Sequence, residues 1–464
     1  MVLASNIGGR GIKVLLPYAM YSVFAIIACL LERNTFFVAA GCVLLIAAAV
    51  MSIYFYRIDQ SLVSFRLLLS LFWIAGEGLA VMQLSRLQTP WTSMTWLSFS
   101  GFYLLFLAGY DGIQCFVCSK EKKKKITMAE KQLEVVSDTQ FQDRLLVCIR
   151  IVSLVSFATF VAEACILGYI PLFSTDTHAY DHFHISGVHY FTVSCMFTHS
   201  LTLIYLLKYW ARGKNRNKLG KSKTIQLIVY NSLSASIPIL SVSKFQFILT
   251  LALPILIFLL MRPTVSKKKV FAALGVTGVI VAAVAVFMTI RRNYEPGYLN
   301  SIFQMKNENM PLAFQYAYMY IANNYSNFNC LTQAMAQGSV HYAFGLKQLF
   351  PVFALTGLKF VFPSLVAFAA PTTIPELNTL TLIYDAYYDF GLIGVLLFGL
   401  ILGSVCAAVA KKTKESSSNP IGYLFYAQIA LYLALSFFSS WFTVPTTWFW
   451  FALTGILYWY VTKR

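Results

Sequence analysis

Apolar stretches of about twenty residues, joined by short polar connections, recur along almost the whole chain. A helix needs roughly 20 apolar residues to cross the hydrocarbon core of a bilayer. It also satisfies its backbone hydrogen bonds internally, as the absence of water there requires. The pattern therefore predicts an all-α, polytopic membrane protein with about 12 transmembrane helices. The predicted helices cover residues 14–31, 36–56, 62–83, 95–117, 145–168, 187–207, 225–242, 246–262, 270–289, 387–409, 421–440 and 445–461.

The composition supports this interpretation, because charged residues make up 12% of the chain and hydrophobic residues 58%. Soluble domains carry about 25% charged residues. The net charge of +18 is typical of Lys- and Arg-rich cytoplasmic loops, so we predict no nucleic-acid partner. The nine cysteines do not indicate a disulfide framework, since nearly all lie in or beside apolar stretches. The apolar run from Val14 to Leu31 lacks a small-residue cleavage site and is expected to be the first helix rather than a cleaved signal.

The distribution of lysine and arginine indicates the orientation. With both termini in the cytoplasm, most of the 36 basic residues fall in cytoplasmic connections, as the positive-inside rule requires. The longest connection then lies on the extracytoplasmic side, between the ninth and tenth helices. We expect helices one to nine in residues 1–289, this loop in residues 290–386, and helices ten to twelve in residues 387–464.

The long loop contains an apolar stretch of its own, Leu349 to Ala370, which we do not expect to cross the membrane. A crossing there would place Lys411 and Lys463 outside, against the charge rule. We predict a re-entrant or interfacial segment instead. The aromatic stretch from Glu308 to Asn329 is expected to form one or two helices lying across the outer face.

Charged side chains within the predicted transmembrane helices include Arg66, Glu77, Arg150 and Glu163. An isolated charge in the bilayer is costly, so such residues need partners or a route to the interface. Arg150 and Glu163 are too far apart along one helix to pair with each other. The favoured interpretation for all four is structural pairing with a group on another helix.

Two groups of residues bear on metal binding. Histidines cluster beside Asp176 and Asp181 in a predicted outer loop, at positions His178, His182, His184 and His189. Imidazole and carboxylate groups suit zinc, but this spacing fits no structural zinc pattern. Cys115 and Cys118 form a lone CxxC without a second pair. We therefore predict no metal site and no cofactor.

Basic residues are rare on the predicted outer side, which makes each one informative. Arg291 and Arg292 end the ninth helix, Lys244 lies between the seventh and eighth helices, and Lys347 lies in the long loop. Adjacent guanidinium groups form a fork that suits phosphate. We predict that these four residues bind a pyrophosphate at the outer lipid interface. Anchoring of the ninth helix at the interface is the alternative for the two arginines.

Candidates for acid–base chemistry lie in the same loop. His341 is its lone histidine and suits a general base, although a lone histidine is often only packed or solvated. The carboxylates are Glu295, Glu376, Asp385 and Asp389. Asp385 and Asp389 share a face if the tenth helix begins there, or they bond to its first turn. We take His341, Glu295 and Glu376 as the catalytic candidates.

The tyrosines of the loop suit stacking on sugar rings, although aromatic residues also gather at membrane interfaces. The predicted glycan-binding residues are Tyr318, Tyr320, Tyr325, Tyr384, Asp385 and Asp389.

The whole layout resembles the Wzy-type oligosaccharide repeat-unit polymerases, the O-antigen and capsule polymerases of bacteria, which are related to the O-antigen ligases. The resemblance rests on a dozen helices, a large outer loop late in the chain, and outward basic residues after the seventh and ninth helices. Two stretches add to it. They are Tyr320-Ile-Ala-Asn-Asn-Tyr-Ser-Asn-Phe328 and Tyr384-Asp-Ala-Tyr-Tyr-Asp-Phe-Gly-Leu-Ile-Gly394.

The resemblance implies a GT-C-like, metal-independent glycosyltransferase in the bacterial cytoplasmic membrane. Its substrates would be oligosaccharides carried on undecaprenyl pyrophosphate at the outer leaflet, joined with release of undecaprenyl pyrophosphate. The family's outward arginines correspond to Arg291, Arg292 and Lys244, where lysine departs from the more usual arginine. The ligases' loop histidine corresponds to His341. A chain-length regulator and a flippase of the same pathway are the implied protein partners.

Several alternatives remain at this stage. An O-antigen ligase shares the chemistry and differs only in its acceptor. A lipid-linked oligosaccharide flippase or polysaccharide exporter should show matched halves and short outer loops. A polyprenyl-phosphate sugar transferase should carry acidic residues in a long first outer loop, which here is only a short connection around Glu32. A non-catalytic membrane scaffold is the last alternative.

Overall fold

The computed structural model describes residues 2–124, 138–174, 179–211, 219–261, 297–415 and 420–463. Within these ranges the secondary structure is helical, and the one β-type pairing is an isolated antiparallel bridge between Ser85 and Met305. The predicted all-α class is thus confirmed for the described residues. The chain divides into two compact units. The first comprises Met1–Lys131, Pro296–Lys412 and Tyr432–Thr447, and the second comprises Gln132–Glu295, Thr413–Leu431 and Trp448–Arg464.

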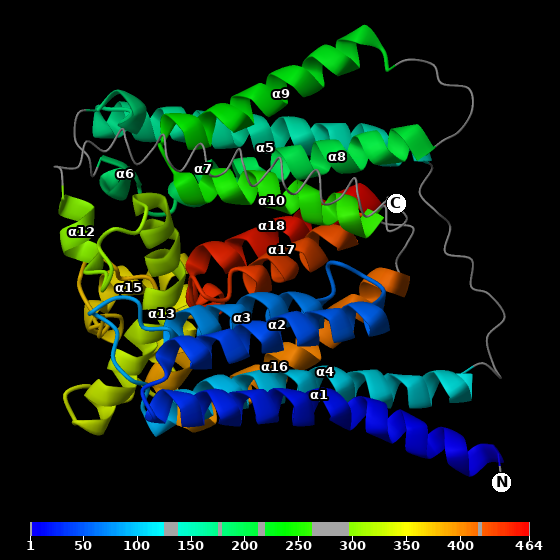
Figure 1. Cartoon of the computed structure of the whole chain (residues 1–464). Helices are drawn as coiled ribbons and strands as arrows, with labels where there is room; N and C mark the ends of the chain where they lie inside the picture. Colours follow the sequence, from blue (N-terminus) through cyan, green and yellow to red (C-terminus); the bar gives the residue numbers. More distant parts are fainter. Residues whose placement is uncertain are drawn as a thin grey trace. The chain divides into compact units, whose positions relative to one another are not determined.

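The first unit contains four long helices from the start of the chain, several shorter ones, and the long helix α16 (Figure 1). Its elements are α1 (Val2–Arg33), α2 (Phe37–Asp59), α3 (Phe65–Val81), α4 (Ser93–Lys124), α12 (Tyr298–Phe303), α13 (Leu312–Ala336), α14 (Leu346–Leu355), α15 (Leu358–Val361), η3 (Pro363–Leu365), α16 (Tyr384–Glu415) and η4 (Trp441–Thr443).

The second unit is built mainly from the middle of the chain. Its elements are α5 (Asp138–Leu167), η1 (Pro171–Phe173), α6 (Ala179–His182), α7 (His189–Thr192), η2 (Val193–Cys195), α8 (Met196–Ala211), α9 (Lys221–Leu240) and α10 (Lys244–Met261). Most of α17 (Gly422–Ala434) and of α18 (Pro445–Thr462) also belongs to it.

Described helices overlap each predicted transmembrane range except 270–289, which lies outside the described residues. Within the described part, five helical segments are long and apolar enough to cross a membrane. They are Leu15–Arg33, Phe37–Asp59, Gln140–Leu167, His189–Trp210 and Tyr384–Thr413. For the other ranges, a crossing stays a prediction.

Close packing of α4 against α16 depends on glycine. A Cβ atom added at Gly403 would lie 2.0 Å from the carbonyl oxygen of Phe106, and one added at Gly109 would lie 2.1 Å from that of Leu400. Small residues allow membrane helices to approach in this way, because the helix backbones then meet directly. This contact fixes α16, whose first turn carries part of the candidate site.

Arg66 and Glu77 in the first unit each contact a polar group on another helix, as predicted. The Arg66 guanidinium lies 2.5 Å from a carboxylate oxygen of Asp59 and 2.7 Å from one of Asp111. The Tyr21 hydroxyl donates to Glu77 over 3.2 Å. In the bilayer these contacts stabilise groups that would otherwise lack partners.

The second unit shows the same pattern at Glu163, which is fully buried. Its carboxylate accepts the hydroxyl hydrogen bond of Thr192 and lies 3.1 Å from His189 Nδ1. Arg150, the fourth of these charged residues, is exposed.

The predicted aromatic segment forms a single helix, α13, which runs crosswise to α1–α4 (Figure 1). It packs closely on α3, where the absence of a side chain at Gly76 leaves room for the Tyr325 ring. The apolar stretch at 349–370 forms short helices only. The ten residues of α14 rise by about 15 Å, half the thickness of the hydrocarbon core.

Buried asparagines of α13 hold the segment that precedes α16. The Asn327 side chain donates to the carbonyl oxygens of Leu377 and Thr379, over 2.7 and 2.8 Å. The Asn324 side chain donates to the Phe437 carbonyl over 2.7 Å. Because these buried amides are bonded to backbone, the two loops that they contact are fixed against α13.

Candidate functional site

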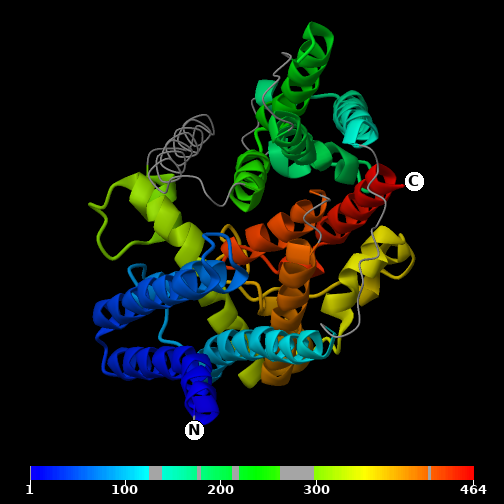
Figure 2. The same ribbon diagram turned by 90° about the vertical axis from the view of Figure 1, so that its right-hand side faces the viewer.

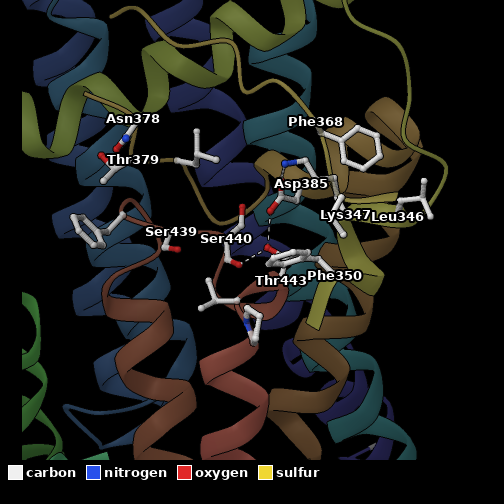
Figure 3. Close-up of a pocket in the computed structure, with 15 residues that line it drawn as sticks. Leu346, Lys347, Phe350, Phe368, Asn378, Thr379, Asp385, Ser439, Ser440 and Thr443 are labelled. Atoms are coloured by element: carbon white, nitrogen blue, oxygen red, sulfur yellow. Dashed lines mark hydrogen bonds and ion pairs between the residues drawn. The ribbon is translucent and has the colours of Figure 1, made fainter. Parts of the chain in front are cut away.

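A pocket of about 440 Å³ lies in the first unit, where α14, the first turn of α16, and two loops meet (Figure 3). Its volume is within the range typical of small-molecule sites. The lining residues are Leu346, Lys347, Phe350, Val366, Phe368, Asn378, Thr379, Leu380, Asp385, Phe438, Ser439, Ser440, Thr443, Val444 and Pro445. One cation and one carboxylate stand among apolar and hydroxyl-bearing side chains.

One carboxylate oxygen of Asp385 is hydrogen-bonded, and the other is buried without a hydrogen-bond donor. It lies in the first turn of α16 and is 6% exposed. The Thr443 hydroxyl donates to its Oδ2 over 2.5 Å. Its Oδ1 has no hydrogen-bond donor among the described residues and lies 3.4 Å from the Lys347 ammonium. A fixed carboxylate with one uncommitted oxygen is suited to accept a proton or a ligand hydroxyl.

Lys347 is positioned by the same turn of α16. The Asp389 carboxylate accepts the backbone N–H groups of Lys347 and Gln348, over 3.1 and 2.8 Å. It therefore caps the N-terminus of α14, a contact that is electrostatically favourable. The Lys347 ammonium also lies 5.0 Å from the centre of the Tyr388 ring. Both aspartates thus contact α14. Asp385 contacts the Lys347 ammonium, and Asp389 contacts the backbone N–H groups of Lys347 and Gln348.

A break in α16 separates this turn from the rest of the helix. The backbone leaves helical geometry at Phe390 and at Gly391, where φ is 60° and ψ is −145°. This conformation is essentially restricted to glycine. The Tyr342 hydroxyl oxygen lies 3.0 Å from the place where a Cβ of Gly391 would be, and a ring carbon lies 3.2 Å from it.

Polar groups for a sugar-like ligand come from both loops. Ser439, Ser440, Asn378 and Thr379 lie along the pocket wall opposite Lys347 (Figure 3). The Ser440 hydroxyl is committed to the Thr381 carbonyl over 2.9 Å. These loops are the ones that α13 fixes, so the polar wall is rigid.

Three of the predicted site residues belong to this pocket. Lys347 and Asp385 line it, and Asp389 positions α14 beside it. The ring of Tyr320, another predicted residue, stacks 5.5 Å from that of Phe438, a lining residue.

Three predicted glycan-binding tyrosines prove to be core residues. Tyr318, Tyr325 and Tyr384 are buried, so no ring face is open to a sugar. The Tyr318 hydroxyl donates to Gln88, that of Tyr325 to the Trp73 carbonyl, and that of Tyr384 to the Pro371 carbonyl. Burial also raises the pKa of Tyr318 and Tyr325 above the usual range, which keeps both phenols neutral.

The remaining predicted residues lie elsewhere. His341 and Glu376 are exposed and do not line the pocket. Arg291, Arg292 and Glu295 lie outside the described residues. Lys244 is the first residue of α10 in the second unit, and the structure does not describe its side chain.

Sequence reasoning missed Ser439, Ser440 and Thr443, which lie at the connection between the last two predicted helices. The signal was the polar break Ser439-Ser-Trp-Phe-Thr443 between two apolar runs, on the side predicted to face outward. This short break gave no indication from sequence that Thr443 would lie against Asp385, 58 residues away.

The described residues contain no group of three or more His, Cys, Asp or Glu side chains arranged to hold a metal ion. Asp176 and His178 of the histidine-rich loop lie outside the described part.

Comparison with known proteins does not assign the chain to a family. No protein-family model, curated protein or solved structure gives a significant match.

Proposed function

We propose that this chain is a membrane glycosyltransferase that polymerises oligosaccharide repeat units carried on undecaprenyl pyrophosphate at the outer face of the bacterial cytoplasmic membrane. The observation that carries the proposal is the Lys347–Asp385 pair, separated by 3.4 Å in a pocket with hydroxyl, amide and apolar walls. These are the groups that an anionic leaving group, a sugar and a lipid chain would each require. The resemblance to the Wzy-type polymerases supplies the substrate class.

The proposed reaction makes one glycosidic bond and breaks one bond to phosphate. An acceptor sugar hydroxyl loses its proton to Asp385 Oδ1 as its oxygen attacks the anomeric carbon of the donor. The bond between that carbon and the pyrophosphate oxygen breaks, and the electron pair leaves with the pyrophosphate. The Lys347 ammonium stabilises the charge that develops there, which is the main electrostatic demand of such a step.

Each residue around the pair has a positioning role in this scheme. Thr443 holds Oδ2 of Asp385, which leaves Oδ1 without a hydrogen-bond donor and able to take the proton of the acceptor. Asp389 fixes the α14 terminus and thereby Lys347. The base is assigned to Asp385 rather than to His341 or Glu376, because neither of those residues lines the pocket. Arg291, Arg292 and Lys244 stay proposed pyrophosphate ligands.

The test is reconstitution of the purified protein in vesicles with lipid-linked repeat units and a metal chelator, with products separated on a gel. A ladder of repeat multiples is expected. Transfer of repeats to a different lipid would show that the activity is that of a ligase and not of a polymerase. Movement of the lipid-linked unit across the vesicle membrane without any product would rule out both activities and indicate a flippase.

Variants connect the ladder to the pocket. Asp385→Asn and Lys347→Ala should each reduce ladder formation by at least a hundredfold, the usual cost of losing one charge-stabilising group. Lys359→Ala is the matched control, because Lys359 lies in the same loop but not in the pocket. Full ladders from Asp385→Asn would refute the assignment of the base.

A further inference from the structure

Helix α14 has two different faces. One face lines the pocket through Leu346, Lys347 and Phe350. The opposite face carries Leu349, Val352 and Leu355, which are 49%, 51% and 42% exposed. Their spacing of three residues places them on a single stripe of the helix.

The exposed apolar surface continues into the next turn of chain. Leu358, Phe360, Val361 and Phe362 are all exposed, and Phe360 reaches 65%. Large side chains exposed together in this way mark a contact surface, because isolated apolar residues are common but contiguous groups are not. The one cation within this surface, among the described residues, is Lys359, whose ammonium lies 4.9 Å from the centre of the Phe360 ring.

This surface adjoins an exposed apolar stripe of α16. Gly345, directly before α14, lies against Phe390, whose ring would be 3.4 Å from a Cβ at that glycine. Phe390 is exposed, and so are Ile393 and Leu397 further along α16. These residues lie in Tyr384–Thr413, one of the segments long and apolar enough to cross a membrane. Figure 2 shows the chain around α14, in yellow, beside α16, in orange.

From these observations we propose that the outer faces of α14 and α15 are immersed in the acyl chains of the outer leaflet, so that α14 is the wall between the pocket and the bilayer. An amphiphile would then enter the pocket sideways, with its charged head at Lys347 and its apolar chain passing the edge of α14 into lipid. The identity of that amphiphile as a polyprenyl pyrophosphate rests on the proposed function. The lipid-immersed surface does not.

The charge and the chain geometry of this segment fit a bilayer. A lysine beside an aromatic ring can keep its stem in the apolar layer and its ammonium among lipid phosphates. Glycines with positive φ precede both short helices, Gly345 at 96° and Gly357 at 77°. A left-handed glycine lets the chain turn sharply at the start of each short helix.

The test of the surface uses a benzophenone amino acid at Phe360 in otherwise unchanged protein, reconstituted in phosphatidylethanolamine and phosphatidylglycerol vesicles. After irradiation, the intact mass should show a phospholipid adduct. Position Glu376 serves as the matched control, because it is exposed in the same loop but carries a charged side chain, outside the apolar surface of α14 and α15. We expect at least fivefold more adduct at Phe360. Equal yields of phospholipid adduct at the two positions would overturn the inference. Crosslinks from Phe360 to a second protein chain instead of to phospholipid would also overturn it.

A second position tests sideways entry. With the benzophenone at Phe350, on the pocket face, added undecaprenyl pyrophosphate should form an adduct, and excess inorganic pyrophosphate should lower its yield by competing for Lys347. Undecaprenyl pyrophosphate adducts at Glu376 but not at Phe350 would contradict entry past α14. Neither measurement reads polymerisation. A protein that makes normal ladders but gives no lipid adduct at Phe360 would overturn this inference and leave the proposed function standing.

Discussion

The Lys347–Asp385 pair allows a structural role to be separated from a functional one. We consider three variants, Lys347→Met, Asp385→Asn, and the two combined. Each single change leaves one partner of a largely buried pair without its counter-charge, since the side chains are 18% and 9% exposed. The double variant removes both charges and leaves two groups of nearly the original shape.

The expected magnitudes follow from the geometry. Two unit charges at 3.4 Å attract by about 5 kcal/mol at an effective dielectric constant of about 20. Desolvation offsets much of this attraction, so the intact pair contributes little net stability. Removal of one partner should cost about 3 kcal/mol, because the other charge stays buried. Removal of both should cost about 1 kcal/mol, about 5 kcal/mol less than the sum of the two single losses, and this difference is the coupling energy between the residues.

The assay is thermal unfolding in detergent, combined with ladder formation in vesicles. Each single variant should unfold several degrees below the parent protein, and the double variant should recover most of that loss. All three should lack ladders, because the recovered stability restores neither the base nor the cation. A double variant that is as unstable as the sum of the single variants would refute the pairing argument. A double variant with full ladders would refute the proposed chemistry.

Three further predictions concern the scaffold and the untested residues. Gly403→Ala should lower the unfolding temperature through overpacking worth about 1–3 kcal/mol, whereas Gly112→Ala, which meets no atom within 4 Å, should be neutral or slightly stabilising. A destabilising Gly112→Ala would undermine the packing argument. Asp389→Ala should accelerate hydrogen exchange in the first turn of α14 and cost about 0.5–2 kcal/mol as a lost cap; unchanged exchange there would contradict the capping role. His341→Ala should keep full ladders and Arg291→Ala should abolish them in a folded protein; the reverse result would return the base to the histidine and remove the arginine from the pyrophosphate site.

The helices could be predicted from sequence because their signal is local. An apolar run of sufficient length has few alternatives in a bilayer. The charge rule similarly predicted that the stretch from Leu349 to Ala370 is not a full crossing, and the structure gives short helices there. The sequence also predicted that Arg66 and Glu77 would each contact a group on another helix, because an isolated charge in a bilayer is always costly. It did not predict which residues these partners are.

The pocket was predictable only in part, because its walls come from distant parts of the chain. Asp385 and Thr443 touch across 58 residues of sequence, and no periodic pattern connects them. The burial of the predicted glycan-binding tyrosines could not be foreseen for a different reason. An aromatic ring suits a sugar, a membrane interface or a core equally well, and only tertiary packing placed Tyr318, Tyr325 and Tyr384 in the core.

The break at Gly391 affects how the pocket would respond to bilayers of different thickness. Helices respond to a thicker or thinner bilayer chiefly by changing their tilt. Because α16 loses helical geometry at Phe390 and Gly391, a change in its tilt need not be transmitted to the turn that carries Asp385 and Asp389. That turn is fixed instead to α14 and η4. We expect the pocket to keep its geometry across bilayers of different acyl-chain length.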